Sequence, residues 1–411
     1  MKRRIVQWTA ALLILLVGGM GYFHTELRQL YHTVRLFEPE LIVRNFSNMA
    51  QIFPSITIPR IGPIDQFKHR PQTLPSTFSY QDTEYSIQKW LSASGTTALV
   101  VLKGDTITFE SYYQGTHEDD ARISWSMAKS FLSALFGVAV EEGVITDLNT
   151  TVTDYVPSLK GSGYDGVSIK DVLQMSSGVY FNEDYGDFNS DINRMGRLMA
   201  LGGSFDEFAA TLQRWRAPGT YMAYVSIDTH VLGMVLRAAT GQRIADYFKA
   251  KLWSKLQPEG DAIYLTDSTG EPMVLGGLNI LSRDYLRFGK LYRDFGRLNG
   301  EQIIPAQWIK DSITPDAPHL IPGKRANANT HWGYGYQWWI PEHANQEFVA
   351  IGIYGQYIYI NRQADVVIVK NSTNTHFMAN HYESMDIALA AFRAIAHSLA
   401  VSPHLKAATD L

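Results

Sequence analysis

Two residue pairs in this chain have the spacing at which a serine hydroxyl and a lysine amine can share a proton. Ser126 and Lys129 form one Ser-x-x-Lys match, and Ser86 and Lys89 form a second. In a helix, residues three apart lie on the same face with their Cβ atoms about 5–6 Å apart, so either lysine can reach its serine. Chance alone gives roughly one or two such matches in a chain this long, so the surrounding sequence must separate them.

Ser126 opens an apolar stretch, whereas Ser86 lies in a polar one. A serine at the start of a buried helix lies beside unpaired backbone N–H groups, which favour a developing oxyanion. Burial disfavours the charged form of Lys129, which lowers its pKa and makes the amine a better base. The apolar stretch contains Phe131, Leu132, Leu135, Val138 and Val140. The motif therefore predicts that Ser126 is a nucleophile and Lys129 its proton partner; the alternative is that Ser126 caps its helix and Lys129 extends to solvent.

Composition excludes several other chemistries. The 411 residues are 45% hydrophobic and 18% charged, which is typical of globular proteins, and the net charge of -4 does not favour a nucleic-acid partner. No cysteine is present, which rules out a thiolate nucleophile and a cysteine zinc site. The chain has no Gly-x-Ser-x-Gly elbow and no His-Glu-x-x-His helix, and His376 and His381 are too far apart for one helical face. We expect neither a metal nor a cofactor.

The N-terminal residues predict a membrane anchor. Lys2, Arg3 and Arg4 precede an uncharged run, residues 5–23, which as a helix would be roughly 28 Å long, close to the bilayer core. The basic flank places the rest of the chain on the exported, periplasmic or extracytoplasmic side of the cell membrane. A cleaved signal peptide is the alternative, but the run ends without the small-residue Ala-x-Ala exit of such peptides. We therefore expect residues 1–24 to form a single uncleaved membrane pass.

The remaining chain predicts one catalytic domain after a linker. Residues 25–75 are rich in proline after a short helical stretch and are interpreted as the linker; residues 76–400 are the domain. Alternation predicts a hairpin of residues 97–102 and 106–112, and residues 126–295 are mostly helical. Further strands are expected at 334–339, 348–353, 356–360 and 366–370, with a final amphipathic helix at 384–399. The fold class is α/β of the α+β type: an antiparallel sheet flanked by terminal helices, with a helical insert and an active site between them.

Several segments, in this order and spacing, resemble the serine β-lactamase-like hydrolases, specifically the branch of the 6-aminohexanoate-dimer hydrolases and related esterases. The likeness covers most of residues 80–398 and implies a β-lactamase/transpeptidase-like fold. Its motifs are Ser-Trp-Ser-Met-Ala-Lys-Ser at 124–130, Asp-Val-Leu-Gln-Met-Ser-Ser-Gly-Val at 171–179, Asn-Glu-Asp-Tyr at 182–185, Pro-Gly-Thr at 218–220 with Tyr-Val-Ser at 224–226, Gly-Gly-Leu at 276–278 with Ser-Arg-Asp at 282–284, and Gly-Ile-Tyr-Gly-Gln at 352–356.

The resemblance implies roles for further residues. Tyr224 would share the proton transfer with Lys129, and which of the two is the formal base stays open because coupled groups titrate together. The backbone N–H groups of Ser126 and Ile353 would form the oxyanion hole, with Gly352 on the same strand edge. Ser226 would relay a proton or hold the leaving group. Tyr185, in a loop that is mobile in this branch, would contact the substrate.

Two departures from the family pattern shape the predicted function. Ser226 stands where many relatives have asparagine, and the inner strand reads Ala350-Ile351-Gly352 where penicillin-binding relatives have Lys-Thr-Gly. The missing lysine favours an exported, membrane-tethered hydrolase of small esters or amides over a β-lactamase or D,D-peptidase acting on cell-wall peptides. A non-catalytic penicillin-binding-like sensor is a third possibility, which the presence of Ser126, Lys129 and Tyr224 opposes.

Overall fold

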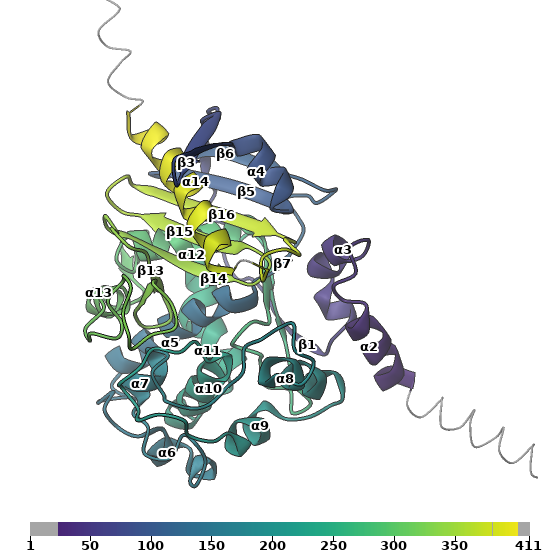
Figure 1. Cartoon of the computed structure of the whole chain (residues 1–411), viewed down its shortest axis with the longest axis vertical. Coiled ribbons are helices and arrows are strands. Elements are labelled where there is room, and N and C mark those ends of the chain that lie inside the picture. Colours follow the sequence, from purple (N-terminus) through teal and green to yellow (C-terminus); the bar gives the residue numbers. More distant parts are fainter. Residues whose placement is uncertain (1–23, 380, 402–411) are drawn as a thin grey trace, which may run out of the picture.

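The centre of the molecule is an eight-stranded sheet (Figure 1). A computed structural model describes residues 24–379 and 381–401. The strand order is β12-β13-β14-β15-β16-β5-β6-β2, and all neighbours are antiparallel except β2 and β6. The central strands β5 and β16 are buried along almost their whole length, which explains their near-continuous apolar sequence. The strands are β12 Gly333–Tyr334, β13 Trp339–Ile340, β14 Glu347–Gly352, β15 Gln356–Asn361, β16 Val366–Ser372, β5 Thr96–Lys103, β6 Thr106–Tyr112 and β2 Lys68–His69.

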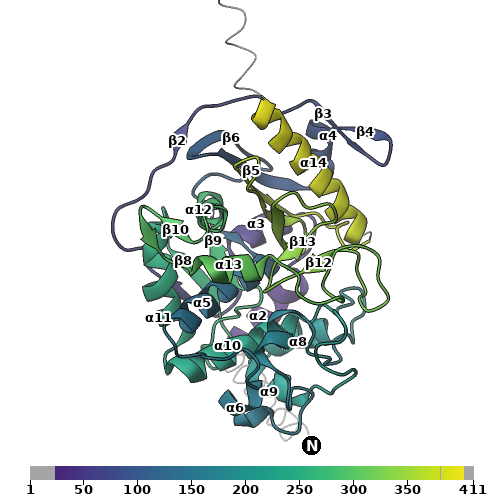
Figure 2. The ribbon, with the colours of Figure 1, turned by 90° about the vertical axis from the view of Figure 1, so that its left-hand side faces the viewer.

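Helices cover both faces of this sheet. The helix α12 (Ser282–Arg293) lies against β15, β16 and β5 on one face, and α4 (Ile87–Ala93) and α14 (His381–Val401) lie on the other (Figures 1 and 2). The predicted hairpin of β5 and β6, the strands β14 to β16 and the C-terminal helix are all present. Residues 334–339, predicted as one strand, form instead the ends of two short strands, β12 and β13, joined by a turn. The hairpin of β3 (Thr77–Tyr80) and β4 (Thr83–Ser86) precedes α4.

The helical insert lies below the sheet in Figure 1. A second, four-stranded sheet of order β1-β8-β9-β7, which sequence patterning did not predict, joins two strands of the insert, β8 and β9, to two strands that precede it, β1 and β7. In chain order from just before the insert, the elements are β7 Arg122–Ile123, η2 Trp125–Met127, α5 Ala128–Glu141, α6 Val152–Tyr155, η3 Pro157–Leu159, α7 Ile169–Leu173, α8 Asp191–Ala200, α9 Phe205–Thr211, α10 Ser226–Thr240, α11 Ile244–Phe248, η4 Lys249–Trp253, η5 Ser254–Leu256, β8 Ala262–Leu265 and β9 Leu278–Ile280. After α12 follow β10 Arg297–Leu298, β11 Glu301–Gln302 and α13 Ala306–Ser312.

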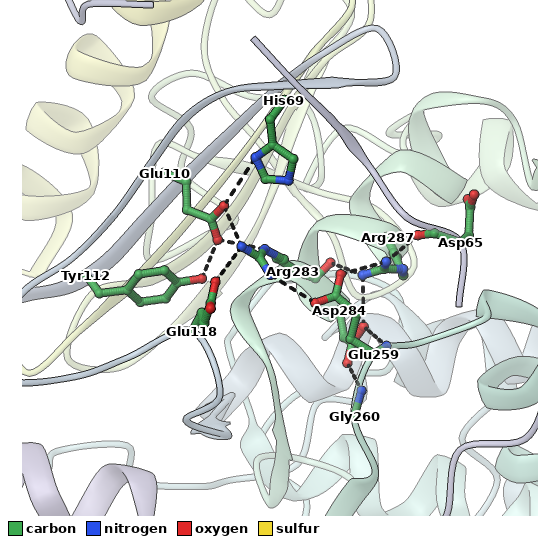
Figure 3. Close-up of polar contacts among 10 residues, drawn as sticks. All are labelled: Asp65, His69, Glu110, Tyr112, Glu118, Glu259, Gly260, Arg283, Asp284 and Arg287. Carbon is green, nitrogen blue, oxygen red and sulfur yellow. Dashed lines mark hydrogen bonds and ion pairs between the residues drawn. The ribbon is translucent and has the colours of Figure 1, made fainter. Parts of the chain in front are cut away.

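Two arginines of α12, the half-buried Arg283 and the buried Arg287, join the sheet to the insert (Figure 3). Arg283 on α12 forms a bidentate pair with Glu110 on β6, at 2.8 and 3.0 Å, and also reaches Glu259 at 3.2 Å. Arg287, one turn later, pairs with Glu259 at 2.8 Å and with Asp284 at 3.1 Å. Bidentate, partly desolvated pairs of this kind fix orientation as well as adding energy. The Ser-Arg-Asp motif at 282–284 therefore holds the two parts of the domain together.

The segment before the domain carries structure of its own. Residues 24–58 contain α2 (His24–Val34), α3 (Ile42–Ser47), η1 (Met49–Gln51) and β1 (Ser55–Ile58), and β1 extends the small sheet by pairing with β8. The Phe46 side chain is fully buried. The region interpreted as a linker thus adds a strand and a buried aromatic side chain to the domain. The apolar run at 5–23 lies outside the described residues; within 24–379 and 381–401, no helix has the length and apolarity needed to cross a membrane.

Candidate active site

Ser126 lies in η2, the 3-10 turn that runs directly into the buried helix α5. The preceding residue, Trp125, has a φ of 43°, an unfavourable backbone conformation for a bulky side chain. Such conformations persist only where the surroundings impose them, and they concentrate at functional sites. Here the Trp125 ring is held by Phe46 at 5.5 Å and by Tyr354 at 6.1 Å between ring centroids. The N-terminal segment therefore helps to fix the backbone beside Ser126.

Lys129 makes three polar contacts at the base of the site. Its Nζ lies 2.8 Å from Ser126 Oγ, 3.3 Å from Ser226 Oγ and 3.0 Å from the backbone oxygen of Leu275. The side chain is 1% exposed, so the alternative in which Lys129 extends to solvent does not hold. The Leu275 carbonyl only accepts, whereas a hydroxyl can also donate. A neutral Lys129 can therefore keep its protons towards Leu275 and Ser226 and direct its lone pair at the Ser126 hydroxyl.

Burial and two carboxylates set the charge of Lys129. Burial lowers the pKa of Lys129 to about 7, and the nearby charges of Glu183 and Asp228 partly oppose that shift. Burial also raises the pKa of Glu183, while the charge of Lys129 lowers it. Asp228 is buried as well, which raises its pKa to about 8, against the hydrogen bond donated by Tyr164 at 2.7 Å. The lysine is thus available in its neutral form near neutral pH.

Tyr224 contacts both members of the Ser126–Lys129 pair. Its ring lies 5.0 Å from Lys129 Nζ and stacks on Trp339, with centroids 5.2 Å apart and planes 22° apart. Burial raises the pKa of the Tyr224 phenol well above its usual value, although a hydrogen-bonding contact with Ser126 works in the opposite direction. The phenol is therefore protonated at neutral pH and can donate a proton.

Ser226 is placed by a residue that the sequence analysis did not single out. Ser226 begins α10, and its backbone N–H donates to Glu183 Oε1 at 2.5 Å. Glu183 belongs to the Asn-Glu-Asp-Tyr segment, from which only Tyr185 was selected as a site residue. A carboxylate beside the first N–H groups of a helix satisfies a donor that has no partner within the helix. Glu183 thereby holds the loop of Tyr185 against the end of α10.

Gly352 ends β14, the strand that borders the site, and Ile353 begins the turn that follows. A Cβ added to Gly352 would approach the backbone oxygen of Ser124 to 2.5 Å and the Trp125 Cβ to 3.1 Å. Only glycine lets β14 come this close to the turn that carries Ser126. The next residue, Ile353, lines a cavity together with Ser126. The strand and the nucleophile turn are thus brought into direct contact at the position where the family resemblance places the oxyanion hole.

The predicted site residues meet at one small cavity of about 110 Å³. Ser126, Tyr185, Tyr224, Gly352 and Ile353 all line it, and Lys129 and Ser226 lie immediately behind Ser126. Residues that the sequence did not indicate complete the wall; they are Glu183, Asn329, Ile351, Phe377, Met378, Tyr382 and Met385. Trp339 also lines the cavity, whereas Trp332 and Trp338 are buried. The second Ser-x-x-Lys match, Ser86 and Lys89, lies outside this cavity. Ser86 caps α4, and its hydroxyl oxygen accepts from the Lys89 backbone N–H at 3.4 Å.

A buried Ser-x-x-Lys pair with a tyrosine, in a cleft between an antiparallel sheet and a helical insert, defines a serine hydrolase of the penicillin-recognising class. The chain belongs to the β-lactamase family, which residues 91–392 match. It is 30% identical over 295 residues to the 6-aminohexanoate-dimer hydrolase of Paenarthrobacter ureafaciens, covering 70% of this chain and 75% of that protein.

Solved structures share the architecture. A putative 6-aminohexanoate-dimer hydrolase from Bacillus anthracis superposes with a TM-score of 0.77 at 24% identity, covering 87% of this chain and 96% of the other. A D-stereospecific amidohydrolase from Streptomyces sp. superposes with a TM-score of 0.54 at 17% identity, covering 70% and 93%. The predicted family and fold class are confirmed.

Proposed function

We propose that this hydrolase cleaves small esters or amides through an acyl-enzyme on Ser126. The observation that carries the proposal is the 2.8 Å contact between Ser126 Oγ and Nζ of the buried Lys129. A serine hydroxyl is a weak nucleophile at neutral pH and needs an adjacent base. Lys129 is the only described lysine in such contact with the Ser126 hydroxyl, and its burial keeps part of it neutral.

Lys129 and Tyr224 have different tasks in this scheme. Lys129 accepts the Ser126 proton as Oγ attacks the carbonyl carbon. Tyr224, whose high pKa keeps it protonated, donates its proton to the departing oxygen or nitrogen and recovers one from Lys129. Water then attacks the acyl-enzyme by the same route, which frees the acid and returns the proton to Ser126. Ser226 holds the Lys129 amine in place, and Tyr185 lies over the substrate.

Backbone donors stabilise the oxyanion. The N–H groups of Ser126 and Ile353 are assigned to this task because η2 and the end of β14 are in contact through Gly352. One such donor is typically worth about 3–4 kcal/mol of transition-state stabilisation. The close approach permitted by Gly352 therefore has a catalytic as well as a structural value.

Small acyl groups suit the cavity better than cell-wall peptides or β-lactams. The cavity is about 110 Å³, and β14 presents Ile351 and Ile353 to it. Position 350, where a Lys-Thr-Gly strand would place its cation, is a buried alanine. A substrate carboxylate would find no lysine on this strand. The 6-aminohexanoate-dimer hydrolase relative supports amide cleavage as one reaction.

The proposal includes export and a membrane anchor. It is supported by the sequence alone: the basic residues 2–4 followed by the uncharged run at 5–23. Expression of the full chain, followed by fractionation, should place activity in the membrane fraction, and deletion of residues 5–23 should release it. Intact mass of the mature protein distinguishes the anchor from a signal peptide, since cleavage would remove the run.

Turnover measurements test the chemistry. The full chain should hydrolyse p-nitrophenyl butyrate, and Ser126→Ala and Lys129→Met should each lose at least about 10³-fold in kcat. Ser254→Ala and Lys255→Met, both on η5 away from the cavity, are matched controls that should retain activity. Nitrocefin should be a poor substrate. Full activity in Ser126→Ala would overturn the proposal, and nitrocefin turnover matching ester turnover would instead support the β-lactamase alternative.

A further inference from the structure

A second and larger cavity lies on the opposite face of the large sheet from α12. Its volume is about 630 Å³, within the roughly 300–1,000 Å³ range of small-molecule sites. It is bounded by β15 and β16 below and by α4 and α14 at the sides, and its lining residues differ from those of the catalytic cavity. Polar and aromatic side chains from several elements contribute to it: Thr77, Ser86, Trp90, Tyr357, Lys370 and Asn374.

Lys370 projects into this cavity because of strand alternation. On β16, Asn371 faces α12, where its Oδ1 accepts from Ser282 at 2.8 Å. Successive side chains of a strand point to opposite faces, so Lys370 points away from α12. Its Nζ lies 5.4 Å from the ring of Trp90 on α4 and 6.0 Å from the ring of Tyr357 on β15. The amine thus lies within about 6 Å of two aromatic rings that line the cavity.

Within the described ranges, Lys370 has no counter-ion. The residue is 1% exposed and forms neither a hydrogen bond nor an ion pair through Nζ with another described residue. Burial alone accounts for its lowered pKa, about 7, with no contribution from a neighbouring charge. Buried charges in proteins are normally paired, because an isolated ammonium is costly to desolvate. Lys129, by contrast, has three acceptors. Lys370 is therefore a buried amine without a polar or charged partner among the described residues.

The other charges of the cavity are at its exposed rim. Lys89, His376 and Glu84 are exposed residues of the lining, and Glu84 accepts from Thr77 Oγ1 at 3.3 Å. The cavity wall therefore carries one buried lysine and one rim lysine against one rim carboxylate. This balance favours a ligand with a single negative charge. A phosphate dianion would need more positive charge than this wall supplies. The rings of Trp90 and Tyr357 offer an apolar surface to the rest of the ligand.

We propose that the Lys370 cavity is a binding site for a small monocarboxylate with an apolar or aromatic body, separate from the catalytic cavity. The carboxylate pairs with Lys370 Nζ and with the amide of Asn374, and the body of the ligand lies against Trp90 and Tyr357. The bound carboxylate supplies the counter-ion that the buried Lys370 ammonium lacks. Because pairing favours the protonated amine, ligand binding is coupled to proton uptake by Lys370.

Isothermal titration of the full chain with phenylacetate, and with neutral 2-phenylethanol as a matched ligand that cannot be hydrolysed, tests this site. Phenylacetate should bind at least about tenfold more tightly than the alcohol, because only the anion pairs with the lysine. The affinity should fall between about pH 6 and about pH 9, as Lys370 loses its proton. Lys370→Met and Lys370→Gln should each abolish the preference for the anion, and Ser126→Ala should keep it.

The variants separate this site from the catalytic one. Lys370→Met removes an unpaired buried charge, so it should fold with an unchanged or raised melting temperature, and phenylacetate should raise the melting temperature of the wild type only. Equal binding of phenylacetate to wild type and folded Lys370→Met would overturn the proposal. So would the absence of binding to the wild type. Binding lost in Ser126→Ala but retained in Lys370→Met would assign the carboxylate to the catalytic cavity and equally overturn it.

Discussion

Gly352 on β14 lies against the backbone oxygen of Ser124, two residues before the proposed nucleophile, so closely that an added Cβ would come within 2.5 Å of it. Both partners of this contact are buried, and the atom approached is backbone, which cannot rotate away. The spacing between the nucleophile turn and the strand edge is therefore set by the absence of a side chain at position 352.

Gly352→Ala should consequently impair catalysis more than folding. Displacing β14 moves the Ile353 N–H relative to Ser126, and an error of about 1 Å in a reacting geometry can cost about 10²-fold in rate. The measurement is kcat for p-nitrophenyl butyrate, beside the melting temperature. Gly196→Ala is the control, since Gly196 lies in α8 with open space around its Cα and should tolerate a methyl group. Unchanged kcat in Gly352→Ala would show that the contact does not position the site.

The pH dependence of the reaction should follow the charge of Lys129. A base must be unprotonated, so kcat/KM should rise with pH through the lowered pKa of Lys129, near 7. Burial lowers the pKa of Lys129, and the charge of Glu183 is the larger of the two nearby charges that raise it. Glu183→Gln keeps an oxygen for the Ser226 N–H but removes the charge, so it should move the rising limb to lower pH.

The matched control for Glu183→Gln is Asp228→Asn. Asp228 is the smaller of the two influences that raise the pKa of Lys129, so its replacement should shift the rising part of the profile less. The pH–rate profiles of the wild type and the two variants are the measurement. A shift to higher pH in Glu183→Gln, or an identical profile, would mean that Lys129 is not the group responsible for the limb.

Tyr224→Phe should reveal which step the phenol serves. The variant retains the ring that stacks on Trp339 at 5.2 Å, so its stability should change little. Loss of a general acid costs about 10²–10⁴-fold, and the loss should be greater for an amide than for a nitrophenyl ester, whose leaving group needs no proton. Tyr336→Phe, a tyrosine that packs on Trp308 instead, is the control. Equal losses for both substrates would argue against proton donation by Tyr224.

Lys370 should make the stability of the wild type depend on pH. Its folded-state pKa is lowered to about 7, whereas an unfolded lysine titrates near 10.4. Between these values the unfolded chain binds a proton that the folded chain lacks, so the free energy of unfolding from this group rises as pH increases from about 7 towards about 10. Urea unfolding at several pH values should show a smaller rise in Lys370→Met. Parallel curves for the two proteins would contradict the lowered pKa.

Local patterns in the sequence predicted the parts of the fold that depend on neighbouring residues. The hairpin of β5 and β6 and the strands β14 to β16 follow from alternation and apolar runs with short turns between them. The pairing of β1 with β8, across about 200 residues, has no local signal. Residues 25–75 were therefore interpreted as a linker, although Phe46 within them is buried against Trp125 and Tyr354.

The site residues likewise divide into those that local motifs predicted and those that only tertiary contacts bring to the site. Ser126, Lys129, Tyr224, Ser226, Tyr185, Gly352 and Ile353 belong to motifs, and the structure brings them to one cavity. Glu183 was missed because an acidic residue in a polar loop normally faces solvent; its contact with the Ser226 N–H, 43 positions away, is tertiary. Lys370 at the end of Val-Val-Ile-Val resembles a lysine leaving a strand for solvent, and only the covering α4 and α14 bury it.

The most direct test of the account is the site of covalent labelling by a fluorophosphonate probe. Intact mass of the full chain should show a single adduct, and peptide mapping should place it on Ser126 and not on Ser86, the serine of the second motif. The adduct should be absent in Ser126→Ala and form much more slowly in Lys129→Met, because the lysine activates the hydroxyl. A folded protein that stays unlabelled, or an adduct that persists in Ser126→Ala, would contradict the assignment of Ser126 as the nucleophile.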